Sequence, residues 1–165
     1  EMVIRDWSSD VCSSDLPNPT SIRLYPSLCL FEGTGISVGR GTDFPFQVIG
    51  YPHPDFGTFT FVPESRPGFA VTPLHQGQTC YGIDLRNDSL PPRFTLSFLL
   101  KFFHLSGRKE SFFTQPSFFD KLAGNATLPT QILEGRTEVE IRESWKPALE
   151  HFRKKRKPYL LYPEE

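Results

Sequence analysis

The stretch FQVIGYPHPDFGTFTFV (46–62) gives the clearest evidence for the fold. Over residues 58–61 threonine alternates with phenylalanine, the period-two pattern of a strand with one buried face. A loop broken by proline and glycine follows over 63–77. We predict three strands in this part of the chain, over 46–51, 58–62 and 79–85.

Helical periodicity replaces the strand pattern from residue 94 onward. Phe94, Phe98, Phe102 and Leu105 recur at steps of three or four residues, and Gly107 is a natural stop. This spacing predicts an amphipathic helix over 94–105.

Capping signals predict two further helices. The sequence SFFD (117–120) resembles a capping box and predicts a short helix that ends near Gly124. A second capping box lies at TEVE (137–140), and we expect the last helix to start near Ser144, with Pro147 in its first turn.

The order of these elements indicates the fold class. Before the strands, Pro26 interrupts the apolar segment 21–31, which predicts a helical turn on each side of Pro26 rather than one helix. Strands followed by helices are typical of the α+β class. We therefore predict a small mixed or antiparallel sheet of about three or more strands, covered by C-terminal helices.

Length and composition indicate one globular domain. The chain has 165 residues, of which 38% are hydrophobic and 14% aromatic, so it can bury a core. It has no apolar run of the length of about 18 residues that a membrane span requires. Its formal net charge of −1 argues against a strongly basic nucleic-acid binder.

We interpret the first sixteen residues as foreign to the protein. The sequence DWSSDVCSSDL (6–16) matches a sequencing adapter codon by codon, and the alternative is a genuine leader rich in serine and aspartate. Without 1–16, which holds one basic and four acidic residues, 17 basic and 15 acidic groups remain. The only methionine, Met2, also falls in this segment, so we expect the natural chain to begin upstream and any targeting signal to lie there.

The sequence EGTGISVGRGT (32–42) is the first candidate for a binding site. Four glycines in this segment let the backbone turn sharply and approach a ligand closely, but neither the P-loop nor the dinucleotide-binding pattern is present. Arg40, between two glycines, can offer a bidentate fork to a carboxylate or phosphate. Glu32 can accept sugar hydroxyls or act as a catalytic carboxylate. The alternative is a structural loop in which Arg40 and Glu32 pair with each other.

Other reactive residues indicate no further site. Cys29 and Cys80 are either two buried thiols or one disulfide, and no metal-binding motif accompanies them or the four histidines. We therefore expect no metal and no cofactor. The basic run RKKRK (153–157) is typical of a solvated helix end, and the alternatives are binding to nucleic acid or to acidic lipid.

Four blocks and one tryptophan carry a resemblance to a known family. These features are LYPSLCLFEGTGISVGRGTDFPFQVIGYP (24–52), GQTCYGIDLR (77–86), FDKLAGN (119–125), Trp145 and YLLY (159–162). With them the chain resembles the C-terminal domain of NamZ-like exo-β-N-acetylmuramidases, and the resemblance covers essentially all of 17–165. Two departures are Gly35, where the family commonly has asparagine, and Val38, where it often has an acidic residue.

The resemblance implies an enzyme of bacterial peptidoglycan turnover. Such an enzyme removes N-acetylmuramic acid from the non-reducing end of cell-wall fragments, in the periplasm or after export. The resemblance also implies that a Rossmann-like N-terminal domain carries the acid/base machinery and meets this domain at the cleft. That domain is missing here, so we expect residues 17–165 to be an accessory domain that is inactive, or nearly so, alone.

The same resemblance suggests roles for residues of the glycine-rich segment. Glycoside hydrolysis usually needs two carboxylates, about 5–9 Å apart, and only Glu32 is a candidate in this chain. Muramic acid carries a lactyl carboxylate, for which Arg40 is the expected partner. We expect Glu32, Thr34 and Thr42 to shape the cleft by hydrogen bonding. The alternative function is a non-catalytic module that binds peptidoglycan or sugar.

Overall fold

The structure is a computed structural model that describes residues 16–68, 70–87, 94–107 and 109–161. Except for Leu16, the adapter-like segment lies outside the described residues. The elements are, in chain order, α2 (Pro19–Leu28), η1 (Cys29–Gly33), β1 (Val48–Tyr51), η2 (Pro54–Phe56), β2 (Phe59–Phe61), β3 (Cys80–Asp84), α3 (Ser97–Leu105), η3 (Glu110–Phe112), α4 (Pro116–Ala123), α5 (Leu128–Leu133), α6 (Glu138–Arg156) and η4 (Lys157–Tyr159), where η denotes a 3-10 helix.

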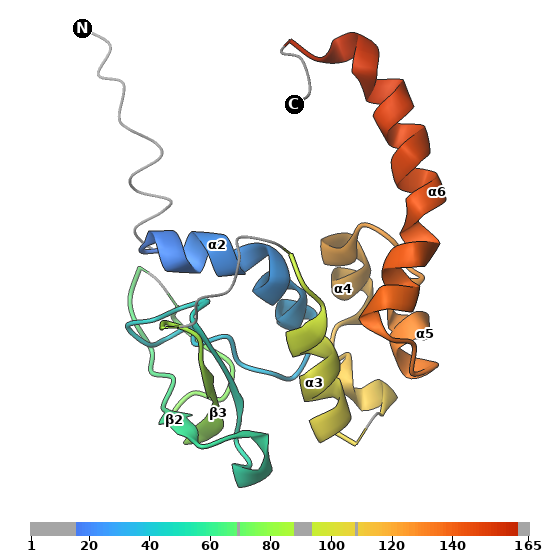
Figure 1. Cartoon of the computed structure of the whole chain (residues 1–165). Helices are drawn as coiled ribbons and strands as arrows, with labels where there is room; N and C mark the ends of the chain where they lie inside the picture. The colour runs from blue at the N-terminus through green and yellow to red at the C-terminus, as the bar shows by residue number, and fades with distance from the viewer. Residues whose placement is uncertain (1–15, 69, 88–93, 108, 162–165) are drawn as a thin grey trace, which may run out of the picture.

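The predicted α+β class is confirmed, and all three predicted strands are present. They form an antiparallel sheet in the order β1–β3–β2, in which Gly50 of β1 faces Gly82 of β3. Figure 1 shows the sheet on one side of α3 and the helices α4, α5 and α6 on the other. Each strand is two residues shorter than its prediction.

Phenylalanine side chains connect the sheet side of the core to the helical side. Phe102 of α3 meets Phe31 edge-to-face at 5.7 Å and also packs against Phe56 at 5.8 Å. Phe113 packs against Phe119 of α4 at 4.9 Å. Such edge-on pairs are a favoured aromatic geometry, so the abundance of phenylalanine serves a packed core, as its helical spacing indicated.

The predicted break at Pro26 is wrong, because α2 runs through it. Asn18 and Ser21 form a capping box, in which the Ser21 N–H donates to Asn18 Oδ1 at 3.0 Å, and Pro19 occupies the first turn. Pro26 lies in the last turn, where it removes only one backbone hydrogen bond. The cap and the buried leucines of α2 outweigh that loss.

The predicted start of the last helix near Ser144 is also wrong. The box at 137–140 is the true cap: the Glu140 N–H donates to Thr137 Oγ1 at 3.3 Å, and the Thr137 N–H donates to the Glu140 carboxylate at 2.8 Å. Helix α6 therefore begins at Glu138 and carries Pro147 in its interior. A reciprocal cap fixes the helix start more strongly than a proline that is tolerated in a first turn.

Helix α4 begins before the serine that was expected to cap it. Pro116 takes the first position, and the described structure shows no side-chain cap bond at this end. The predicted end is confirmed, since Gly124 follows α4 in the left-handed conformation with φ of 71°. The next helix, α5, was not predicted. Within the described residues, no helix is both long and apolar enough to cross a membrane.

Candidate binding site beside the glycine-rich loop

The glycine-rich segment leaves η1 and folds back toward β1. Ser37 and Gly50 exchange two backbone hydrogen bonds of 2.9 Å, which attach the segment to the sheet. Gly39 and Gly41 have φ of 77° and 85°, and a Cβ at Gly41 would lie 2.6 Å from the Glu64 carbonyl oxygen. These two positions therefore require glycine.

Both candidate threonines are buried and fold the segment on itself. The Thr34 hydroxyl donates to the Phe31 carbonyl at 2.7 Å and accepts from the Ile36 N–H at 3.2 Å. The Thr42 hydroxyl likewise donates to the Gly39 carbonyl at 2.6 Å and accepts from the Phe44 N–H at 3.2 Å. Such side-chain turns hold a loop in one shape.

Glu32 and Arg40 form the ion pair that the structural-loop alternative predicted. Arg40 Nη1 lies 3.3 Å from Glu32 Oε1, and the side chains are 35% and 22% exposed, respectively. The Arg40 guanidinium also lies 5.8 Å from the centre of the Phe46 ring. A cation held between a carboxylate and a ring face is well positioned to orient an anionic ligand.

A small pocket of about 170 Å³ opens beside this ion pair. The structure brings Glu32, Thr34 and Arg40 together on its wall, whereas Thr42 is not among the described residues that line it. Val38, which stands where the resembled family often has an acidic residue, also lines this small pocket. Its wall holds one cation and one carboxylate, and the other lining residues are an even mixture of apolar side chains and uncharged polar ones.

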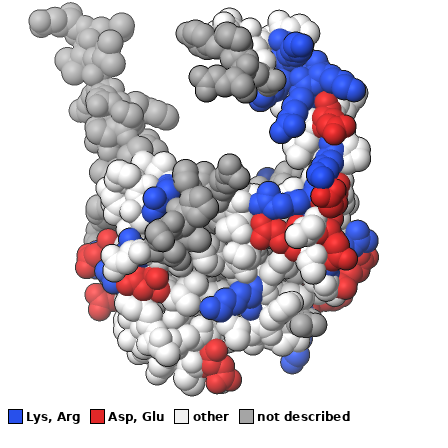
Figure 2. Space-filling view, in the orientation of Figure 1, with Lys and Arg blue, Asp and Glu red and all other residues white. Residues whose placement is uncertain are grey.

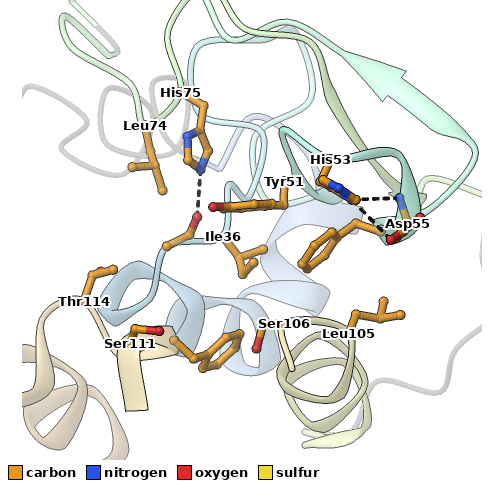
Figure 3. Close-up of a pocket in the computed structure, with 13 residues that line it drawn as sticks. Ile36, Tyr51, His53, Asp55, Leu74, His75, Leu105, Ser106, Ser111 and Thr114 are labelled. Atoms are coloured by element: carbon orange, nitrogen blue, oxygen red, sulfur yellow. Dashed lines mark hydrogen bonds and ion pairs between the residues drawn. The ribbon is translucent and has the colours of Figure 1, made fainter. Parts of the chain in front are cut away.

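A larger pocket of about 480 Å³ adjoins the small pocket. The two share Ile36, Leu74 and Thr114. Figure 3 shows Leu74 and His75 on one side of the larger pocket and Ser106, Ser111 and Thr114 on the other.

His75 is a polar residue of this larger pocket that sequence analysis missed. Its Nε2 lies 2.7 Å from the Gly35 carbonyl oxygen, and its ring meets Tyr51 edge-on at 5.2 Å (Figure 3). His75 has φ of 61°, a left-handed conformation that is uncommon for residues other than glycine. Such outliers are often retained at functional positions.

His53 and Asp55 are the other polar pair on the wall of the larger pocket. The Asp55 N–H donates to His53 Nδ1 at 3.4 Å and thereby caps η2, and the Asp55 carboxylate lies 3.4 Å from the same nitrogen. The available signal was the order of the residues: His53 and Asp55 closely follow the first predicted strand, and His75 lies in the loop before the third.

The remaining reactive residues lie apart from these pockets. Cys29 and Cys80 are both free thiols, and burial raises the pKa of Cys80 to about 11. Neither lines the two pockets. Among the residues the structure places, no group of three or more histidine, cysteine or acidic side chains could hold a metal ion.

Comparison with known proteins identifies the family. The model of the C-terminal domain of the exo-β-N-acetylmuramidase NamZ matches residues 23–162. The chain belongs to this NamZ C-terminal family. Over 166 residues it is 35% identical to the peptidoglycan β-N-acetylmuramidase NamZ of Bacillus subtilis (strain 168), a match that covers 91% of this chain and 39% of that protein.

A solved structure supports the same placement. The crystal structure of a DUF1343 family protein from Bacteroides fragilis matches with a TM-score of 0.81 and 40% identity, covering 91% of this chain and 43% of that one. The chain thus spans about two fifths of the length of these relatives. The glycine-rich segment, both pockets and α6 all lie within the residues matched by the NamZ C-terminal model.

Proposed function

We propose that this chain is the C-terminal domain of a peptidoglycan-degrading glycoside hydrolase that releases terminal N-acetylmuramic acid. The observation that carries the proposal is the small pocket, where Arg40 and Glu32 meet in a domain of the NamZ family. The domain supplies one wall of the substrate cleft. The implied setting is the periplasm or the exterior of a bacterium.

Arg40 recognises the lactyl carboxylate that distinguishes muramic acid from glucosamine. A guanidinium has five N–H donors in a planar fork, so contact with Glu32 is compatible with a second carboxylate on the same group. The pocket of about 170 Å³ suits a substituent of this size better than a whole sugar ring. Glu32 and the Phe46 ring hold the guanidinium in place for the ligand.

The catalytic carboxylates are divided between this domain and the rest of the parent protein. Among the described residues, Glu32 and Asp55 are the carboxylates that line these two pockets, and the Asp55 side chain is largely exposed. Glu32 is the candidate for one of the two carboxylates that glycoside hydrolysis requires. The other comes from an upstream domain.

Restoring the upstream domain tests this division. The parent chain and residues 17–165 alone are compared on a chromogenic β-N-acetylmuraminide. We expect release only by the parent chain. Release by residues 17–165 alone would place the full catalytic set in this domain, and release by neither would contradict a hydrolase.

Two sets of variants test the assigned residues in the parent chain. Arg40→Ala and Arg40→Lys are expected to reduce the preference for muramoyl over glucosaminyl substrates, with lysine keeping the charge but losing the fork. An unchanged preference in both variants would remove Arg40 from this role. Full activity in Glu32→Gln would exclude Glu32 as a catalyst.

The pairing of Glu32 with Arg40 favours a second candidate, a sugar-binding module without catalysis. In that case the Glu32 carboxylate serves to hold Arg40, a role that the ion pair of 3.3 Å supports. Saturable binding of muramoyl fragments by the parent chain, without any product release, would favour this function over hydrolysis.

A further inference from the structure

We propose that the larger pocket, between Tyr51 and Ser111, binds an uncharged pyranose ring. It is the sugar unit next to the muramoyl residue whose carboxylate reaches Arg40. This inference rests on the function proposed for the small pocket and extends it to a second subsite, which takes a different part of the same glycan.

The two pockets are continuous along one wall. They share Ile36, Leu74 and Thr114, so a single extended ligand can occupy both. The larger pocket, about 480 Å³, falls in the range of about 300–1,000 Å³ that is usual for a bound small molecule, and the small pocket does not. These volumes fit a sugar ring in the larger pocket and a substituent of the neighbouring sugar in the small pocket.

The wall chemistry of the larger pocket matches an uncharged sugar. Tyr51 is partly exposed and provides aromatic surface for a C–H face of a ring, whereas Phe56 and Phe112 line the pocket with little exposed surface. His53, Ser111 and the Asp55 carboxylate provide hydrogen-bonding groups for the hydroxyls of the ring. No lysine or arginine is among the described residues that line this pocket. The small pocket has Arg40 instead, so the two subsites differ in the charge they select.

His75 positions the boundary between the two subsites. The Gly35 carbonyl can only accept a hydrogen bond, so Nε2 of His75 carries the proton and donates to it at 2.7 Å. In the neutral ring Nδ1 is then an acceptor, which is a suitable partner for a sugar hydroxyl. His75 thus fixes the backbone at Gly35, and both residues line the larger pocket.

A blocking variant tests the second subsite without disturbing the core. Ser111 is exposed on η3 at the edge of the larger pocket, so Ser111→Trp narrows the pocket from outside. Ser117→Trp is the matched control, since Ser117 is an exposed serine on α4 that lines neither pocket. Binding of N-acetylglucosamine, N-acetylmuramic acid and their β-1,4-linked disaccharide to the chain is measured by NMR titration.

We expect Ser111→Trp to weaken N-acetylglucosamine binding about tenfold or more, and to remove the extra affinity of the disaccharide over N-acetylmuramic acid. Ser117→Trp is expected to leave all three affinities unchanged. Wild-type affinity for N-acetylglucosamine in Ser111→Trp, or no saturable binding of it by the wild-type chain, would overturn the second subsite. An Arg40→Ala variant that binds N-acetylmuramic acid normally would contradict the proposed function instead, which separates the two failures.

Discussion

Single glycines set the tightest steric limits in this domain, and Gly82 is the strongest case. A Cβ on Gly82 would lie 1.7 Å from the Ile49 carbonyl oxygen and 2.6 Å from the Gly50 Cα, both backbone atoms of the neighbouring strand. We expect Gly82→Ala to lower the free energy of unfolding by roughly 3 kcal/mol or more, because the sheet must separate to admit the methyl group. Urea denaturation measures this loss.

Gly35→Ala is the matched control for this prediction. Gly35 has no positive φ, and its Cβ would meet only Thr114 Cγ2, at 3.4 Å. The expected cost is below about 1 kcal/mol. Equal unfolding midpoints for the two alanine variants would contradict the steric assignment at Gly82.

Gly35 also tests whether its departure from the family pattern matters for binding. The resembled family commonly has asparagine here, and the available space accepts a side chain beside Thr114, where both pockets meet. We expect Gly35→Asn to fold normally and to bind N-acetylmuramic acid several-fold more tightly, because an amide adds hydrogen-bonding groups at the junction. Titration with N-acetylmuramic acid measures the change, and Gly35→Ala controls for loss of the glycine itself. Equal affinities for the asparagine and alanine variants would show that the amide makes no contact with the ligand.

The N-terminus of α6 makes the domain sensitive to acid. Hydrogen bonds from the Thr137 backbone N–H and then from its hydroxyl lower the pKa of Glu140. A carboxyl group with a lowered folded pKa stabilises the protein above its unfolded pKa, and this stabilisation is lost as pH falls through the folded value. Unfolded glutamate titrates near pH 4.3, so we expect the free energy of unfolding to fall as the pH drops below about 4.5.

Glu140→Gln is expected to reduce this pH dependence, measured as the difference in unfolding free energy between neutral and acid solution. Glu138 adds to the same pH range: burial raises its pKa, but hydrogen bonds led by Arg142 outweigh burial and the net pKa is lowered. The dependence should therefore be smaller in the variant but not absent. Glu143→Gln, on the same helix and outside the cap, is the control. Identical pH profiles for the two glutamine variants would contradict the cap assignment.

Strands were predicted more accurately than helix starts, for a physical reason. Alternation over 58–61 predicts a strand with one buried face. The structure has this arrangement, since Phe61 is buried and Thr60 is exposed. Helix starts depend on competing local signals. Pro147 and Ser117 each offered a plausible start, whereas the chain uses the reciprocal box at Thr137 and the proline at 116.

The candidate site could be predicted only where its residues are close in sequence. Glu32, Thr34 and Arg40 fall within one short segment, and the structure places them on one small pocket. His75 reaches the same region through a contact with Gly35, forty residues earlier in the chain. Local sequence patterns cannot predict such a contact, because it depends on the path of the loop before β3.

At the scale of the whole molecule, α6 extends well beyond the rest of the fold (Figure 1). One face of this helix begins in the core, with Ile141 fully buried and Trp145 half-buried. The same face continues outward with Leu149 and Phe152, which are 50% and 56% exposed. Figure 2 shows Lys and Arg side chains gathered near the projecting end, where the last turn carries Arg153, Lys154, Lys155 and Arg156.

The upstream domain of the proposed hydrolase is the expected partner for this face. The family match continues to residue 162, so the exposed part of α6 belongs to the shared domain, and the relatives are more than twice as long as the match. A continuous apolar stripe that is only half covered is typical of an interface between domains. The basic end of α6 would then face acidic groups of that domain.

A double variant, Leu149→Ser with Phe152→Ser, tests this assignment in two settings. In the 165-residue chain it is expected to leave the melting temperature unchanged, because neither side chain is in the core. In the longer parent chain it is expected to lower the melting temperature by several degrees, since each buried apolar side chain stabilises an interface by about 1.5–3 kcal/mol. Val139→Ser is the control, because Val139 is 68% exposed on another face of the same helix. If the double variant and Val139→Ser gave the same melting temperature in the parent chain, this face of α6 would stay in solvent. The basic residues at the end of α6 would then serve only to complement the helix dipole.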